Sequence, residues 1–126
     1  MTFSYDDSCW PILVVTAPAR AAEDAELRSH LRRLGAYLER GVCAVIVDNS
    51  RAPAPTLKQA TLTAQARADD ERRYPGRQLV RVVVGERGPF ATVDDAFAFC
   101  LARIAQHAAQ TPFDARSGAM PFRRAA

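Results

Sequence analysis

The sequence predicts an α/β fold with a mixed sheet of about four strands and helices packed on the sheet. Two continuous apolar runs rich in β-branched residues, at 12–15 and 42–47, are typical of strands covered on both faces. A third run at 79–84 is apolar except for one arginine. A segment with helical spacing follows each of these runs. An alternating aromatic and polar segment precedes the first run, as expected for an edge strand. Strand and helix alternation of this kind favours right-handed crossovers and parallel central strands.

The first predicted element is a β-hairpin. Residues 3–8 alternate aromatic and polar side chains, which is the period of a half-exposed strand. The acidic pair at 6–7 supplies turn chemistry, and a second strand begins near Trp10 and continues to about Thr16. Pro18 stops this strand. We expect the first strand at an edge of the sheet, antiparallel to the second.

The segment from about 22 to 40 predicts an amphipathic helix. Its leucines recur at helical spacing and form one stripe: Leu27, Leu31, Leu34 and Leu38. Acidic residues in the first turns and Arg40 at the end suit the helix dipole, and Gly41 is a natural C-terminal cap. His30 borders the stripe, so we expect a half-buried packing residue there.

A loop and a second helix follow the predicted parallel strand 42–47. The loop contains two prolines and ends at Thr56, whose hydroxyl is suited to cap a helix at 57–73. The apolar face of this helix is thin and consists mainly of alanine and threonine. We therefore expect the helix to pack closely or at an edge of the domain.

A fourth strand at 79–84 and a last helix complete the predicted domain. Thr92 is expected to cap that helix, and Phe97, Cys100 and Ile104 mark its buried face. Periodicity is lost from Thr111 onward. The sequence therefore predicts a single domain over residues 1–110 and an irregular tail over 111–126.

Composition and charge argue against several classes of function. The 126 residues fit one domain, and no apolar run approaches the ~20 residues that span a bilayer. Residues 1–15 carry no basic side chain, unlike a secretory or transit peptide, so we expect a soluble cytoplasmic protein with no membrane partner. The net charge of +3 is spread thinly over the chain after residue 26, without interleaved aromatic residues. Nucleic-acid binding is therefore not expected.

Cysteine and histidine spacing indicates neither a metal site nor a redox motif. Cys9, Cys43 and Cys100 are far apart, and neither His30 nor His107 lies at zinc-type spacing from them. We expect three reduced thiols in the core, no metal and no cofactor. No base is paired with a nucleophile in the pattern, and His107 lies near a helix end where a cation suits the dipole. The protein is not expected to be an enzyme.

The candidate site lies where the predicted parallel strands end. Ligands of open α/β sheets bind beyond the carboxyl ends of the strands, which here carry the loops 16–19, 48–55 and 85–89. Asp48, Ser50 and Thr56 are possible phospho-acceptor or partner-binding residues, because an anion is favoured near a helix N-terminus. The alternative is structural: Asp48 and Ser50 form a turn, and Thr56 only caps the helix.

Several segments resemble a STAS domain, the fold of anti-sigma-factor antagonists and of modules attached to transporters. They are the hairpin, the helix ending YLERG, the strand VCAVIVDNS and the helix after it. The segment FATVDDAFAFCLARI is similar to the last helix of small stand-alone STAS-like bacterial proteins. The resemblance covers residues 3–108 and rests on element order and hydrophobic pattern. Anti-sigma antagonists carry an Asp-Ser-Ser-Gly-type loop with a phosphorylated serine, whereas the loop at 48–50 lacks the glycine.

This resemblance implies a non-catalytic regulatory or scaffold module that acts through protein–protein interaction in bacterial signalling. Its implied partner is a kinase, a sigma-factor regulator or a transporter-linked protein. The alternative function is a small-ligand-binding or enzymatic α/β domain that uses the loop Asp48–Pro55. We also expect a homodimer, because Phe3, Tyr5 and Trp10 on an edge hairpin would leave apolar surface on a monomer.

Overall fold

The computed structural model describes residues 2–85 and 88–110. Its elements, in chain order, are β1 (Ser4–Asp6), β2 (Ile12–Thr16), α1 (Asp24–Arg40), β3 (Ala44–Asp48), α2 (Leu57–Arg73), β4 (Val80–Val84) and α3 (Val93–Gln110). Over this part of the chain the strands form a four-stranded sheet in the order β1-β2-β3-β4. Strand β1 is antiparallel to β2, and the remaining pairs are parallel. The predicted α/β fold with a mixed sheet is confirmed, whereas the predicted tail lies outside the described residues.

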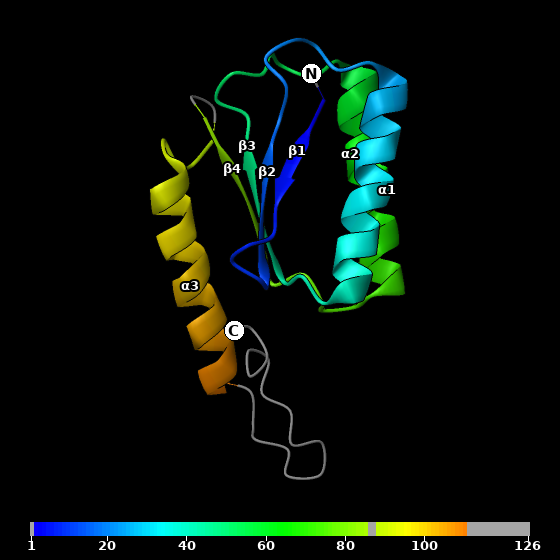
Figure 1. Cartoon of the computed structure of the whole chain (residues 1–126). Helices are drawn as coiled ribbons and strands as arrows, with labels where there is room; N and C mark the ends of the chain where they lie inside the picture. Colours follow the sequence, from blue (N-terminus) through cyan, green and yellow to red (C-terminus); the bar gives the residue numbers. More distant parts are fainter. Residues whose placement is uncertain (1, 86–87, 111–126) are drawn as a thin grey trace.

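The helices form two layers, one on each face of the sheet (Figure 1). The connections β2–α1–β3 and β3–α2–β4 step across the sheet in the same direction. Right-handed crossovers therefore place α1 and α2 on the same face. Helix α3 has no strand after it among the described residues, and it covers the opposite face (Figure 1).

Each face of the sheet has its own apolar core. Between the sheet and α1 the buried residues are Leu13, Val15, Leu34, Tyr37, Val42, Val45 and Val47. Between the sheet and α3 they are Ile12, Cys43, Ala44, Ile46, Val82, Val84, Ala96, Cys100 and Ile104. Alternate residues of each strand contribute to opposite cores, so the parallel strands are buried on both sides as their continuous apolar runs predicted.

The hairpin turn lies later in the chain than the sequence predicted. A turn spans residues 8–11, β1 ends at Asp6, and β2 begins at Ile12 rather than near Trp10. The Asp6 carboxylate accepts hydrogen bonds from the amide and hydroxyl of Ser8 and so forms an Asx turn. Pro11 has no amide hydrogen to donate to the ladder, which explains why the strand starts after it.

Helix α1 has the termini that its sequence favours. Glu23 is the N-cap and forms a capping box with Glu26, so the helix begins slightly later than predicted. At the other end Gly41 adopts φ 113°, and its amide donates to the carbonyl of Leu38. This left-handed conformation is strained for residues with a Cβ, so glycine is the natural cap.

The two cysteines predicted on buried elements are confirmed as core thiols, and the third is not. Cys43 and Cys100 are buried free thiols, and burial raises the pKa of each to about 11. Cys9 is exposed in the hairpin turn, so its predicted core position is wrong. In the same turn Trp10 packs against the core on the α1 face, whereas Cys9 is exposed. Among the described residues, no helix is long and apolar enough to cross a membrane.

Candidate functional site

A cavity of about 450 Å³ lies between α2, α1 and the sheet. The ends of β2 and β3, the loop at 52–55 and the first turns of α2 line its mouth, and Arg81 and Val83 of β4 line the part beside α2. Apolar side chains from all of these elements form most of its wall, including Ala17, Pro18, Leu27, Leu31, Val47 and Val83. Two of the three loops predicted to hold a ligand therefore contribute to one cavity, at the edge of the sheet where α/β proteins bind ligands.

The cavity exists because α2 stands off the sheet. Helix α2 contains no buried residue and packs beside α1, as its thin apolar face predicted. Gly35 of α1 allows this approach, since a Cβ at that position would lie 3.1 Å from the Asp70 carboxylate. The small side chains of Ala60, Thr63 and Ala64 face the cavity and leave it open.

The loop after β3 is anchored to both neighbouring strands. The Asp48 carbonyl accepts from the Ala17 amide at 3.0 Å, and the Asn49 amide donates to the Val84 carbonyl at 2.9 Å. Gly85, at φ 145°, lies close to the Asn49 backbone. A Cβ at Gly85 would approach that backbone to 3.4 Å in a conformation that L residues rarely adopt. The carboxyl ends of three strands therefore hold this wall of the cavity in place.

The structure brings two of the predicted site residues together and places the third apart from them. The Asp48 carboxylate accepts from the Ser50 amide at 3.0 Å, which is the Asx turn of the structural alternative, and Ser50 is exposed. Thr56 lies at the head of α2, where its hydroxyl accepts from the Gln59 amide at 3.1 Å. Of the three, only Thr56 lines the cavity. The use of these residues as a phospho-acceptor or partner site stays a prediction.

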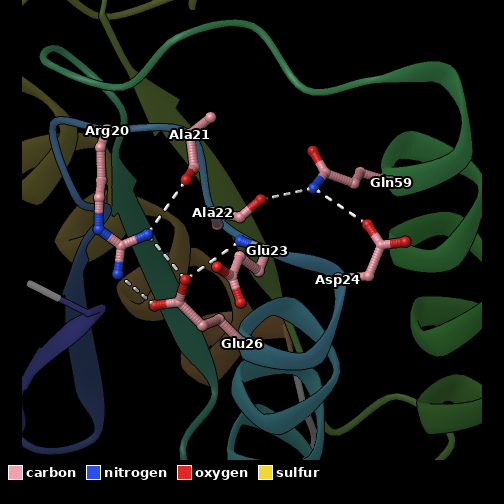
Figure 2. Close-up of polar contacts among 7 residues, drawn as sticks. All are labelled: Arg20, Ala21, Ala22, Glu23, Asp24, Glu26 and Gln59. Carbon is pink, nitrogen blue, oxygen red and sulfur yellow. Dashed lines mark hydrogen bonds and ion pairs between the residues drawn. The ribbon is translucent and has the colours of Figure 1, made fainter.

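Polar contacts fix the rim of the cavity on the α1 side (Figure 2). Gln59 of α2 donates through Nε2 to the Ala22 carbonyl at 2.7 Å and to an Asp24 carboxylate oxygen at 3.3 Å. Arg20 forms a bidentate ion pair with Glu26, with both N–O distances 2.7 Å, and holds the pKa of that exposed carboxyl at about 2. The segment before α1 is thus tied to both helices.

A stacked pair of rings forms another part of the wall. Phe3 stacks on His30 with ring centroids 4.0 Å apart, and the Tyr5 hydroxyl lies 2.6 Å from His30 Nδ1. Burial, together with the charges of Arg81 and Arg33, lowers the pKa of His30 to about 4. The imidazole is therefore neutral near pH 7, and its Nδ1 shares a hydrogen bond with the Tyr5 hydroxyl. His30 is 5% exposed, which is more buried than the sequence predicted.

Arg81 is the residue of this site that the sequence interpretation missed. It is the second residue of β4, paired with Val45 of β3 and on the same face as Val83. Every other strand residue in that core is apolar or aromatic. Burial lowers the pKa of Arg81 to about 10, and the charge of Arg67 on α2 acts in the same direction. In the sequence, the only sign of this residue was the single charge inside the run LVRVVV. Side chains alternate between the two faces of a strand, and in the structure Arg81 is on the α1 face.

The described residues contain no group of three or more histidine, cysteine, aspartate or glutamate side chains placed to hold a metal ion. No protein-family model, curated protein or solved structure matches the chain. The resemblance to STAS domains is neither supported nor contradicted by these comparisons.

Proposed function

We propose that this protein is a non-catalytic module that binds a small ligand in the cavity between α2 and the sheet. The observation that carries the proposal is the cavity itself: about 450 Å³, walled mainly by apolar side chains, with Asn49, Arg67 and Arg81 among its polar residues. Ligand sites in proteins have this size and this mixture of apolar wall and a few polar groups. Of the sequence hypotheses, this is the small-ligand alternative at the loop Asp48–Pro55.

Binding without catalysis is supported by the state of His30. A general base for reaction near pH 7 works best with a pKa near that value. The pKa of His30 is about 4, and its Nδ1 is already hydrogen-bonded to the Tyr5 hydroxyl. The surroundings of His30 therefore hold its ring neutral and fixed in orientation, and they disfavour uptake of a proton.

The experiment is a titration with 1-N-phenylnaphthylamine, a neutral apolar dye that becomes fluorescent in apolar sites. We expect saturable binding with one site per chain. Ala64→Phe places a ring in the cavity and should abolish binding, whereas Ala68→Phe, on the same helix but outside the cavity lining, should not. Absence of saturable binding, or equal binding by both variants, would refute the proposal.

A regulatory role through a protein partner is the second candidate. It is supported by the order of elements, which agrees with the STAS-like pattern, and by the exposure of Ser50 on a loop whose later residues wall the cavity. A partner that contacts this loop could respond to ligand occupancy. The Thr56 hydroxyl is used in capping α2, so Ser50 is the better candidate for a phosphate.

This second candidate is tested by incubating the chain with a serine/threonine protein kinase and mapping phosphate by mass spectrometry. Phosphate on Ser50, lost in Ser50→Ala, would support a phosphoswitch. A chain that stays unmodified at both Ser50 and Thr56 would contradict it and leave ligand binding as the function.

A further inference from the structure

Three arginines line the cavity: Arg20, Arg67 and Arg81. Arg20 is paired with Glu26, whereas the described contacts provide Arg67 and Arg81 with little compensation. The ion pairs among the described residues are Arg20–Glu26, Lys58–Asp24 and Arg72–Asp69, and none includes Arg67 or Arg81. Arg81 lies on a sheet face that is otherwise apolar or aromatic. A charge removed from water is costly unless a partner compensates it, so an arginine in this position calls for an explanation.

Asp70 is the acidic residue whose charge acts on Arg81. It is only partly buried, and its own pKa is raised by burial, with Arg73 and Arg81 opposing that rise. It forms no ion pair with Arg81 among the described contacts. Asp70 is shared between Arg73 and Arg81, and Arg67 is exposed to solvent. Arg81 is therefore the incompletely compensated positive charge of the cavity, which a ligand with a negative charge would balance.

The other polar groups of the cavity suit the same anion. Asn49 offers side-chain amide donors, and the neutral His30 ring lines the same cavity. The N-terminus of α2 is less suited to a phosphate group, because Thr56 already accepts from the Gln59 amide and the Gln59 side chain accepts from the Thr56 amide. The structure therefore favours a carboxylate bound by side chains over a phosphate bound by backbone amides.

We infer that the cavity binds a monocarboxylate with an apolar body, its carboxylate held by Arg81 and Arg67 and its body against the apolar wall. Arginine binds a carboxylate through two parallel hydrogen bonds, which gives both affinity and orientation. The inference rests on the proposed function and adds the chemical class of the ligand.

The test measures displacement of the neutral dye by decanoate, decanol and acetate. Decanoate should displace the dye from the wild-type chain at a concentration at least ten times lower than decanol, and acetate should displace it poorly. In Arg81→Met the advantage of decanoate over decanol should disappear while the dye still binds. Arg67→Met should reduce the advantage, and Arg73→Met, on the same helix but outside the cavity lining, should leave it unchanged.

The possible failures can be told apart. If the dye does not bind the wild-type chain, the proposed function fails. If the dye binds but decanoate is no better than decanol, the cavity is a ligand site and the carboxylate assignment is wrong. The wild-type comparison alone decides this, even if Arg81→Met does not fold. Equal loss of the decanoate advantage in Arg73→Met and Arg81→Met would also overturn the assignment to Arg81.

Discussion

At the scale of single residues, the informative position is a charge inside an apolar strand. The run LVRVVV correctly predicted the strand, because five of its six residues are apolar and three are consecutive valines. The significance of Arg81 depends on which face it occupies and what covers that face, and both are tertiary properties. Strand alternation alone places Arg81 and Val82 on opposite faces of the sheet. It does not show that Arg81 lies beneath a helix that stands off the sheet.

Arg81→Met is expected to stabilise the ligand-free fold by about 2 kcal/mol, because a methionine of similar length removes a partly buried, incompletely compensated charge. Urea unfolding at pH 7 measures the change. Arg103→Met, at an exposed position of α3, serves as the control and should stay within about 0.5 kcal/mol of wild type. A loss of stability in Arg81→Met would show that Arg81 stabilises the fold, contrary to our account. A gain in stability together with weaker carboxylate binding would show that Arg81 is kept for ligand binding at the expense of folding stability.

His30 predicts a specific dependence of stability on pH. Its folded pKa of about 4 lies below the ordinary value of 6.5, so the unfolded chain takes up the proton first as the pH falls. The charged groups acting on His30 are Arg81 and Arg33, and the positive charge of each disfavours protonation of the ring. Its contribution to stability is therefore full above about pH 6.5 and is lost between pH 6.5 and 4, by roughly 3 kcal/mol in total.

His30→Gln isolates this effect, because glutamine has no titratable ring and its side-chain oxygen can accept from the Tyr5 hydroxyl. Free energies of unfolding are measured for both chains between pH 7.5 and 4. We expect the advantage of wild type over the variant to shrink by roughly 3 kcal/mol over that range. A difference in the free energy of unfolding that stays constant with pH would mean that His30 is not held neutral.

At the scale of elements, α2 is the helix that creates the site. Its thin apolar face agrees with a helix that has no buried residue and packs beside α1, and Thr56 was correctly predicted as its cap. The space between α2 and the sheet could not be predicted, because it depends on contacts across distant segments. Gln59 binds the segment before α1 over a separation of more than thirty residues, and Gly35 admits Asp70 at the far end of the helix.

Gln59→Ala is expected to lower the free energy of unfolding by about 2 kcal/mol. The change removes the bonds to Ala22 and Asp24 and half of the capping box of α2. Chemical unfolding measures it. Gln65→Ala, at an exposed position of the same helix, should change stability by less than about 0.5 kcal/mol. Equal effects of the two substitutions would show that the Gln59 contacts do not hold α2 in place.

At the scale of the whole molecule, the sequence predicted the sheet better than it predicted the distribution of the helices. Apolar runs predicted the strands, and crossover handedness accounts for α1 and α2 lying on one face. No such rule applies to α3, which packs on the opposite face over Ile46, Val82 and Val84. The predicted homodimer stays a prediction. Phe99 and Leu101 of α3 are 40% and 50% exposed, so this helix offers apolar surface for contact with a second copy.

The measurement that tests the central claim most directly is an NMR titration of the isotope-labelled chain with the neutral dye. We predict that the largest amide shifts fall on the elements around the cavity, at Val47, Asn49, Ala64 and Val83, while amides in the middle of α3 change little. This pattern does not depend on the charge of the ligand, so it tests the cavity independently of the carboxylate assignment. Shifts concentrated on α3, or no specific shifts at saturating dye, would contradict a ligand site between α2 and the sheet.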